Sequence, residues 1–196
     1  LIVAEAGKRL GYARTEVQRG LTTLRTAAAE ALRLGGEVVP IDFDAGVGKT
    51  AFTKRMPIGP VAGITPFNFP LNLMLHKVAP ALAVGNSIII KPASATPLTA
   101  LAFAKLFDEL DYPAGTFQVV VAKGSDAQQL VEDERIKMLS FTGSDKVGWQ
   151  MKADAGKKQV ALELGGNAAL IVDASADIET AAKRAAVGSF LYAGQI

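Results

Sequence analysis

Short, almost continuously apolar runs alternate with longer amphipathic stretches from Pro57 to the end of the chain. Apolar runs bounded by turn residues favour buried strands, whereas apolar residues at three- and four-residue steps favour helices. Strands joined by helices pair in parallel, and near-continuously apolar strands indicate that both faces of the sheet are covered. The pattern therefore predicts an α/β fold, a parallel sheet with helices on both faces.

This alternation sets the expected elements of the sheet domain. Strands are predicted at 61–65, 87–91, 117–121, 138–141, 160–164 and 168–172. Helices are predicted at 71–84, 98–110, 127–132, 145–155 and 178–190. In such a sheet, ligands bind beyond the carboxyl ends of the strands, so the residues that follow each strand are candidates for a site.

The residues before Pro57 have a different pattern. Residues 1–34 contain no proline, and their apolar side chains recur at helical steps, which predicts a helix that ends at Gly35 and Gly36. Residues 37–43 alternate as a short edge strand does, and a second short strand is predicted at 50–54. A helical segment and a short β-hairpin are therefore expected before the sheet domain.

The turn between the two short strands resembles the end of a phosphate-binding P-loop, because Gly48 and Lys49 are followed by Thr50. A P-loop has another glycine five residues before its Gly-Lys pair, where this chain has Phe43, and it connects a buried strand to a helix. The segment is therefore interpreted as a glycine-rich hairpin turn.

Composition excludes several classes of function. The net charge is +2 and no basic cluster is interleaved with aromatic residues, which argues against nucleic acid and an anionic membrane as partners. No apolar run approaches the length of a membrane span. The chain has no cysteine, so it contains no disulfide, thiolate metal site or thiol nucleophile. Because there is neither a signal-peptide pattern nor an initiator Met, we expect a cytoplasmic protein whose chain begins inside a longer one.

Glu163 is the one carboxylate in the apolar run 160–164, and Gly165 and Gly166 follow that run directly. A carboxylate in a buried strand loses hydration at a cost of several kcal/mol unless it is paired, protonated or facing a cleft. Glycines allow a ligand or another backbone to approach closely. One interpretation is that Glu163 faces a site. The other is a strand-end glutamate in solvent, followed by an ordinary turn.

Polar residues also follow the other predicted strands. An amide, ammonium groups, hydroxyls and glycines would converge on one edge of the sheet with the carboxylate. Each has a structural explanation when taken alone, such as a turn amide, a solvated strand-end cation or a helix cap. The residues are Asn68, Lys91, Ser94, Lys123, Gly124, Ser125, Thr142, Gly143 and Ser144.

Sequence boxes at 57–61, 66–70, 91–92, 141–144 and 163–167 occur in an order that resembles the aldehyde dehydrogenase superfamily. The resemblance covers essentially the whole chain. It implies a Rossmann-like sheet that binds NAD or NADP without the usual Gly-x-Gly-x-x-Gly fingerprint, which is absent after every predicted strand. By the same resemblance, 1–36 is a helical segment of the cofactor domain, 37–56 a strand pair used in oligomerisation, and 57–196 the NAD(P)-binding domain. The catalytic domain would lie outside this chain.

The resemblance also implies roles for individual residues. Asn68 would donate a hydrogen bond from its side-chain amide to the oxyanion that forms when a thiol attacks an aldehyde. Glu163 would be the general base that activates the water for thioester hydrolysis. Lys91 would bind the adenine ribose, and Ser144, at a helix N-terminus, would lie beside the pyrophosphate. The cofactor-binding set that it implies is Ile64, Thr65, Pro66, Phe67, Lys91, Ser94, Gly124, Phe141, Gly143, Ser144, Val147, Leu164 and Gly165, with no metal ligand.

Ser94 bears on cofactor choice, because NAD-preferring members of the family commonly carry a carboxylate three residues after the ribose lysine. A serine there does not repel the 2′-phosphate of NADP, so we expect NADP to be accepted at least comparably to NAD.

The final box, 194–196, resembles the family pattern Gly-Gln-x-Cys, which would place the catalytic cysteine directly after Ile196. A small-molecule aldehyde is then the expected substrate, and a homodimer or homotetramer the expected assembly. The alternatives are a nucleotide-binding pseudoenzyme, a truncated fragment without catalysis, and an acylating or reductive relative that passes the acyl group to another acceptor.

Three further residues are expected to have no chemical role. His76 is predicted in the first helix of the sheet domain, and Trp149 and Met151 in the helix after the Thr-Gly-Ser turn. Packing is the more frequent role for Trp149 and Met151.

Overall fold

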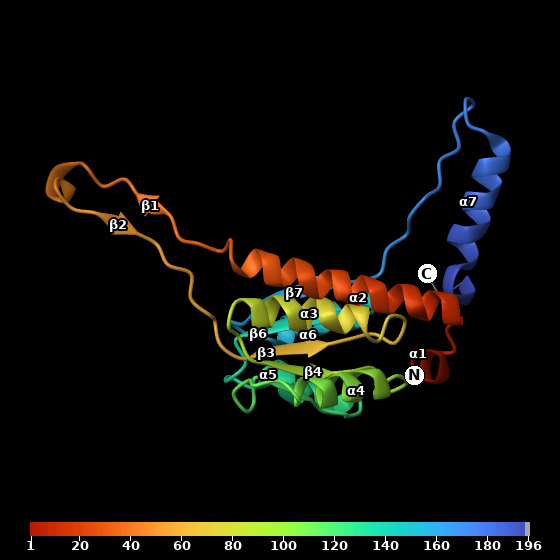
Figure 1. The fold of residues 1–196 in the computed structure, drawn as a ribbon, viewed down its shortest axis with the longest axis horizontal. Helices are drawn as coiled ribbons and strands as arrows, with labels where there is room; N and C mark the ends of the chain where they lie inside the picture. The colour runs from red at the N-terminus through yellow and green to blue at the C-terminus, as the bar shows by residue number, and fades with distance from the viewer. Residues whose placement is uncertain (195–196) are drawn as a thin grey trace.

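Five strands form one parallel sheet in the computed structural model, which describes residues 1–194 (Figure 1). Their order across the sheet is β5-β4-β3-β6-β7. The bounds are β3 (Val61–Ile64), β4 (Ile88–Lys91), β5 (Phe117–Val119), β6 (Met138–Thr142) and β7 (Gln159–Glu163). The chain builds outward from β3 in one direction and then returns to its other side, so a crevice is expected beyond the carboxyl ends of β3 and β6.

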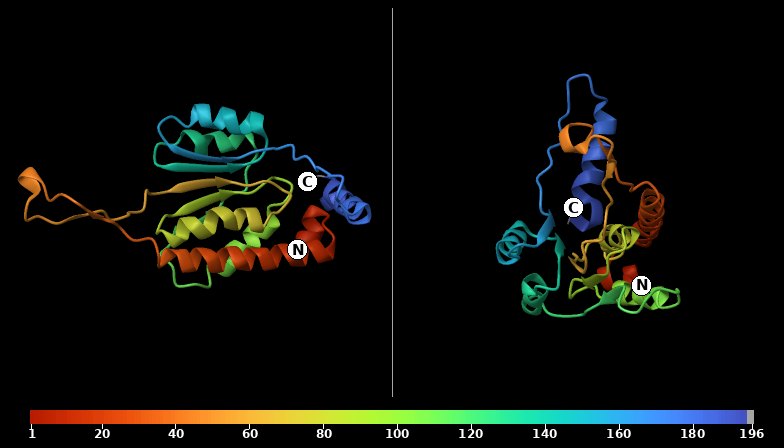
Figure 2. Two further views of the ribbon diagram at one scale, coloured as in Figure 1. Left: turned by 90° about the horizontal axis from the view of Figure 1, so that it is seen from above. Right: turned by 90° about the vertical axis from the view of Figure 1, so that its left-hand side faces the viewer.

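Helices cover both faces of this sheet, as the sequence predicts. On one face lie α3 (Asn72–Ala83) and α4 (Leu98–Phe107), with α2 (Leu10–Ala31) packed on α3. On the other face lie α5 (Gln128–Glu132), which follows the 3₁₀ turn η2 (Ser125–Ala127), and α6 (Asp145–Asp154). The left view of Figure 2 shows the strands between the cyan α6 and the red α2.

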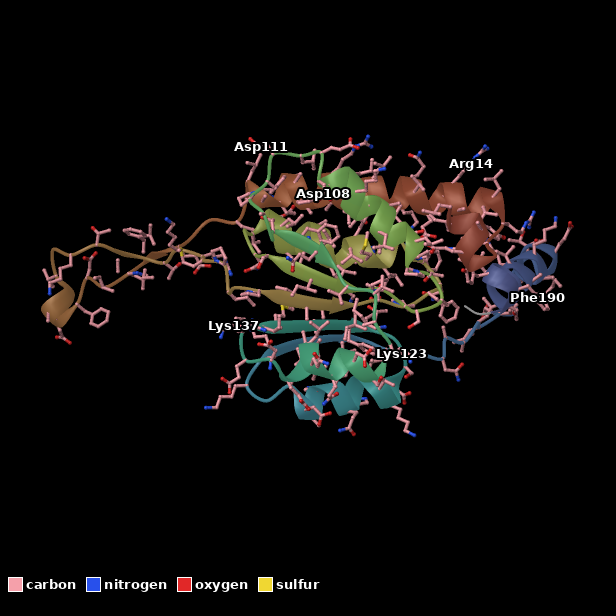
Figure 3. The ribbon with its side chains drawn as sticks, turned by 90° about the horizontal axis from the view of Figure 1, so that it is seen from below. Arg14, Asp108, Asp111, Lys123, Lys137 and Phe190 are labelled. Carbon is pink, nitrogen blue, oxygen red and sulfur yellow. The ribbon has the colours of Figure 1, made fainter. Side chains whose placement is uncertain are left out.

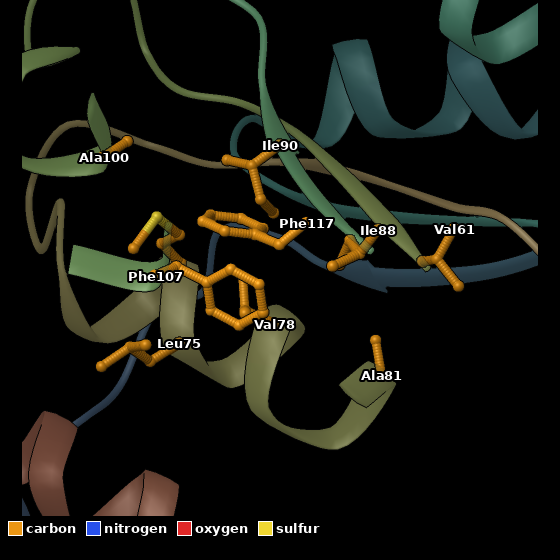
Figure 4. Close-up of a cluster of buried hydrophobic side chains, with 10 residues drawn as sticks. Val61, Leu75, Val78, Ala81, Ile88, Ile90, Ala100, Phe107 and Phe117 are labelled. Atoms are coloured by element: carbon orange, nitrogen blue, oxygen red, sulfur yellow. The ribbon is translucent and has the colours of Figure 1, made fainter. Parts of the chain in front are cut away.

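Residues of one strand divide between two hydrophobic clusters, because successive side chains point to opposite faces. In β4, Ile88 and Ile90 belong to the cluster that contains α3 and α4, whereas Ile89 packs against the cluster of α5 and α6. Phe107 and Phe117 meet edge to face in the first cluster, with ring centroids 5.3 Å apart (Figure 4). Each fully buried isoleucine contributes roughly 1.5–3 kcal/mol, so both faces hold the strands in register.

The prediction of one helix over residues 1–34 is wrong, because the segment forms α1 (Ile2–Ala6) and then α2. Gly7 ends α1 with a φ of 64°, and its N–H donates to the Val3 carbonyl. That left-handed conformation is strained for residues with a Cβ, so glycine permits the chain to change direction there.

The predicted hairpin is present before the sheet domain. β1 (Val38–Val39) pairs antiparallel with β2 (Ala51–Phe52), and the 3₁₀ turn η1 (Asp44–Gly46) lies between them. A strand and not a helix follows the turn, in agreement with the interpretation that it is no P-loop. Figure 1 shows the hairpin extending away from the sheet, on the side opposite the carboxyl ends of the strands.

The strand predicted at 168–172 is wrong. A strand needs a partner for its backbone groups; the chain leaves the sheet after β7, and Ile171 is 89% exposed. Next comes α7 (Ile178–Phe190), whose first turn is capped by Asp177 through a 2.7 Å hydrogen bond from the Thr180 N–H, and then the 3₁₀ turn η3 (Leu191–Gly194). Over residues 1–194, no helix combines the length and the apolar character needed to cross a membrane.

Candidate active site

The carboxyl ends of the five strands lie at one edge of the sheet because the strands are parallel. In Figure 3, Lys123 lies at this edge, whereas Lys137, just before β6, lies at the opposite edge. Phe190 of α7 lies at the same end of the molecule as Lys123. The carboxyl edge is therefore the place where the predicted site residues are found.

The loop after β3 begins with Ile64 and Thr65, which are buried, and the Thr65 N–H donates to the Lys91 carbonyl at 3.2 Å. Pro66 is half-buried and Phe67 is 45% exposed. The Asn68 side-chain oxygen accepts a hydrogen bond of 3.1 Å from the Phe69 N–H. This bond orients the amide and leaves its N–H₂ group as the end available to donate.

The loop after β4 folds over its own lysine. The Lys91 ammonium is buried and donates to the Pro92 carbonyl at 3.1 Å. Burial lowers the pKa of Lys91 below its ordinary value, and the nearby charge of Asp126 opposes that shift. Ser94 is exposed, and its hydroxyl lies 3.4 Å from the Ala122 carbonyl, so the loops after β4 and β5 are neighbours there. Gly124, in the second loop, is exposed.

Ser144 is the N-terminal cap of α6, as predicted, with extended backbone (φ −69°, ψ 146°) and no hydrogen bond from its side chain to the helix. The first N–H groups of α6 are thus free of a side-chain cap at the end of the helix that favours anions. Gly143, half-buried, precedes this cap and Val147, 43% exposed, lies one turn into the helix.

Glycine also brings α6 close to the sheet. A Cβ on Gly148 would lie 2.4 Å from Leu164 Cδ2, and a Cβ on Gly143 would lie 2.5 Å from Phe141 Cζ. Phe141 is buried in the cluster of α5 and α6. Gly165, in contrast, has no neighbouring atom where a Cβ would be. Of this group, Gly165 is the position open to a ligand, whereas Phe141 packs in the core.

Glu163 ends β7, an edge strand, and it is exposed. Its exposure agrees with the second interpretation, a strand-end glutamate in solvent, so the cost of burying a carboxylate does not apply to it here. Its carboxylate nevertheless has a specific partner, because the Thr142 hydroxyl donates to Glu163 Oε2 at 3.1 Å. The Gly143 N–H also donates to the Glu163 backbone carbonyl at 3.0 Å, which fixes the ends of β6 and β7 against each other.

Lys77 contacts the carboxyl end of β6 and was not among the residues predicted from the sequence. Its buried ammonium donates to the Thr142 hydroxyl at 2.8 Å and to the Ser140 hydroxyl at 3.1 Å. Burial lowers the pKa of Lys77 to about 8, and the charge of Glu163 acts in the opposite direction. The sequence feature that could have identified Lys77 is its spacing on α3. Lys77 lies three residues after Met74 and four before Ala81, which places it on the buried side of the helix.

The remaining expectations have mixed outcomes. His76 lies on α3 as predicted and is exposed. Met151 packs in the core, as expected. Trp149 is 58% exposed, and the Lys152 ammonium lies over its ring, 5.2 Å from the ring centroid. Asn68 lies in the loop after β3 and Glu163 ends β7, and β6 lies between these two strands. The nucleophile expected after the 194–196 box lies outside the described residues.

The chain is similar to known proteins over its whole length. The sequence pattern of the Aldehyde dehydrogenase family matches residues 1–196. The 3-sulfolactaldehyde dehydrogenase of Priestia aryabhattai is 44% identical over all of this chain, which spans 42% of that relative. The NAD-dependent benzaldehyde dehydrogenase of Corynebacterium glutamicum has a TM-score of 0.90 at 41% identity, with all of this chain and 42% of that chain covered.

A third similar protein was solved with NADP. The glyceraldehyde-3-phosphate dehydrogenase of Methanocaldococcus jannaschii has a TM-score of 0.77 at 42% identity, over 84% of this chain and 36% of that one. The chain thus spans about two fifths of the length of the curated relative it matches. Because the family pattern matches every residue of the chain, the chain belongs to the aldehyde dehydrogenase family.

Proposed function

We propose that this chain forms the NAD(P)-binding part of an enzyme that oxidises an aldehyde to a carboxylic acid. The observation that carries the proposal is the chain of hydrogen bonds from Lys77 through Thr142 to Glu163 at the carboxyl edge. A carboxylate held at a fixed orientation beside a nucleotide crevice suits a general base. The family membership and the share of its relatives that the chain spans support the remainder.

The residues at the carboxyl edge fit a dinucleotide. The α6 N-terminus, with Ser144 as its cap, offers free N–H groups for the pyrophosphate. Lys91 and Ser94 at the end of β4 would bind the adenine ribose. Leu164 and Gly165 would bound the nicotinamide end, where Gly165 leaves space. When bound, the cofactor would supply the acceptor for the hydride.

The protein groups would act on the aldehyde in two stages. In the first, a cysteine thiolate adds to the aldehyde carbon and the Asn68 amide donates to the resulting oxyanion; loss of hydride from that carbon leaves a thioester. In the second, Glu163 takes a proton from water, the hydroxide attacks the thioester carbon, and the thiolate leaves. Thr142 and Lys77 orient the Glu163 carboxylate. The cysteine is expected just after Ile196, in the full-length enzyme.

The projecting hairpin supports the proposal of a homo-oligomer. Val38 is 78% exposed and Phe52 is 73% exposed, at positions that pair across the two strands. Phe43 at the turn is 67% exposed. Apolar side chains on an exposed two-stranded arm are typical of a surface that another subunit covers. Replacing Val38 and Phe52 by Lys in the full-length enzyme should reduce its mass in sedimentation, and an unchanged mass would exclude the hairpin from the interface.

Glu163→Gln in the full-length enzyme tests the general base. An amide cannot take the proton, so the thioester should form and then be hydrolysed about 10²-fold or more slowly. Rapid mixing should show a burst of reduced cofactor equal to the enzyme concentration, followed by slow turnover. Glu179→Gln, at an exposed position of α7, is the matched control and should behave as wild type. Unchanged steady-state turnover in Glu163→Gln would remove the base role.

The mass of the native protein separates an enzyme from a nucleotide-binding pseudoenzyme. A protein that ends at Ile196 has no cysteine and would overturn the proposed oxidation, although it could still bind the nucleotide. A longer protein whose cysteine directly after Ile196 is labelled by iodoacetamide, with loss of aldehyde oxidation, would support it.

A further inference from the structure

The helices α3 and α4 each follow a residue that has no acceptor side chain. α3 is preceded by Leu71 and α4 by Pro97, and neither forms a side-chain cap. The first N–H groups of a helix have no partner inside the helix and need an acceptor from elsewhere. Each of these helices starts directly after a loop of the proposed site, the Asn68 loop and the Lys91–Ser94 loop.

Glu16 of α2 supplies the acceptor for α3. Its Oε1 accepts hydrogen bonds from the Leu71 N–H at 2.9 Å and from the Asn72 N–H at 3.2 Å. Its other oxygen forms an ion pair with Lys8 in which both side chains are fully buried. A carboxylate with partners on both oxygens is tightly oriented, and the negative charge favours the N-terminus of α3.

Lys8 connects the same ion pair to the residue after Asn68. The Lys8 ammonium lies 3.9 Å from the centre of the Phe69 ring and 4.5 Å from that of Tyr192. The two rings are stacked, with centroids 5.9 Å apart. Burial lowers the pKa of Lys8, and its hydrogen bond to Glu16 opposes the shift. The Asn68 loop is thus held at Phe69 by Lys8 and at Leu71 by Glu16.

Glu5 of α1 performs the same function for α4. Its Oε2 accepts from the Leu98 N–H at 2.7 Å, and its Oε1 accepts from the Thr99 N–H at 3.0 Å and from the Thr99 hydroxyl. Leu98 lies four residues after Ser94. The turn at Gly7 separates the two helices, so that Glu5 faces α4 while Glu16 faces α3.

We propose that Glu16, together with Lys8, is a positioning residue for Asn68, and that Glu5 is a positioning residue for the Lys91–Ser94 loop. The proposal rests on the proposed function, because it takes Asn68 as the oxyanion donor and Lys91 as the ribose ligand. A small displacement of a helix start moves the loop attached to it, and a shift of about 1 Å in a positioned group can cost about 10²-fold in rate. The N-terminal helices therefore set the geometry of two separate parts of the site.

Glu16→Gln and Glu5→Gln in the full-length enzyme test the two assignments against each other. Glu16→Gln should lower kcat by about tenfold, because the step that forms reduced cofactor becomes slower. It should leave the Kd of NADP within about twofold of the wild-type value. Glu5→Gln should raise the Kd of NADP by about fivefold or more and leave kcat at saturating cofactor within about twofold. A purely structural role predicts no such division, so equal effects of both variants on kcat and Kd would overturn the proposal.

Loss of folding is separated from loss of positioning by a second set of variants. Glu16→Gln leaves Lys8 buried without a counterion, whereas Lys8→Met with Glu16→Gln removes both charges and keeps an amide oxygen for the Leu71 N–H. Glu16→Asp keeps the charge and should recover part of kcat. If Glu16→Gln and the double variant both fold and retain wild-type kcat while Asn68→Ala loses it, the positioning role is overturned and the proposed function stands. If Asn68→Ala has no effect, the oxyanion role itself fails.

Discussion

Lys77 is joined to Glu163 by a single side chain, since the Thr142 hydroxyl accepts from the Lys77 ammonium at 2.8 Å and donates to the Glu163 carboxylate at 3.1 Å. A hydroxyl can do both because it carries one donor and two acceptor sites. The direction of the two bonds is fixed, because an ammonium only donates and an ionised carboxylate only accepts. The orientation of Glu163 therefore depends on a residue of α3 that is buried on the far side of Thr142.

Thr142→Val should disconnect Glu163 while keeping the shape of the side chain. A hydrogen bond to a charged group contributes about 1.5–3 kcal/mol, so a loss that affects only the transition state of hydrolysis would slow it about tenfold or more. Rapid mixing with the full-length enzyme should then show a burst of reduced cofactor before slow turnover. Thr142→Ser retains the hydroxyl and should keep most of the steady-state rate. Equal rates for the Val and Ser variants would mean that the link is not used.

Lys77 should make the stability of the fold depend on pH. Its pKa is about 8 in the folded protein, against an ordinary value of 10.5. Between these values the unfolded chain binds more protons than the folded one, so the free energy of unfolding rises with pH across this window. Below about pH 8 the ammonium is charged in both states and its burial is unfavourable. Lys77→Met should therefore stabilise the fold most at neutral pH, by up to about 3 kcal/mol.

Urea unfolding of wild type and Lys77→Met from pH 7 to pH 10 checks this contribution. The advantage of the variant should shrink as the pH passes 8 and approaches 10. Lys137→Met, an exposed position at the opposite edge of the sheet, is the control and should show no such trend. A constant difference between Lys77→Met and wild type would show that the Lys77 charge is not the cause.

Gly63→Ala should disturb both the core and Lys77. A Cβ at this position of β3 would lie 2.5 Å from Ile90 Cδ1 and 3.3 Å from Lys77 Cδ. Such overpacking typically costs about 1–3 kcal/mol, and the displaced lysine stem should also weaken the contact with Thr142. Gly188→Ala in α7 is the control, since nothing lies where its Cβ would be. It should raise helix stability by roughly 0.5–1 kcal/mol.

Apolar runs and helical spacing predict the sheet and its covering helices because burial determines those elements. The exposed hairpin is predicted instead by its alternation and its glycine-rich turn. The predictions at 1–34 and 168–172 fail for other reasons. Gly7 ends α1 with a left-handed backbone conformation and so divides the helical pattern. The apolar run 168–172 pairs with no strand among residues 1–194. Pairing is a property of the folded arrangement and leaves no local pattern in the run itself.

The site shows the same division between local and distant causes. Strand ends place Asn68, Lys91, Ser144 and Glu163 on one edge, which the order of strands and turns predicts. The residues that orient them lie far away in sequence: Lys77 is 86 positions from Glu163, and Glu16 is 55 positions from Leu71. A lysine or glutamate on a helix is most often solvated. Helical spacing alone marks Lys77, and Glu16 stands out only once its burial is known.

Ser94→Glu should shift cofactor preference toward NAD. The Ser94 hydroxyl is exposed beside the loop that carries Asp126, and the Asp126 charge already acts on Lys91. With a neutral side chain at 94, Lys91 can offset the 2′-phosphate, so the full-length enzyme should use NADP at least comparably to NAD. A glutamate adds a like charge, which costs about 1–4 kcal/mol at 4 Å and should lower kcat/KM for NADP relative to NAD by about tenfold.

Asp126→Asn removes a negative charge from the same region and should move the ratio of kcat/KM for NADP to kcat/KM for NAD in the opposite direction. Specificity constants for both cofactors in the three proteins decide the matter, and a ratio unchanged by both substitutions would show that the 2′-phosphate is not bound between these loops.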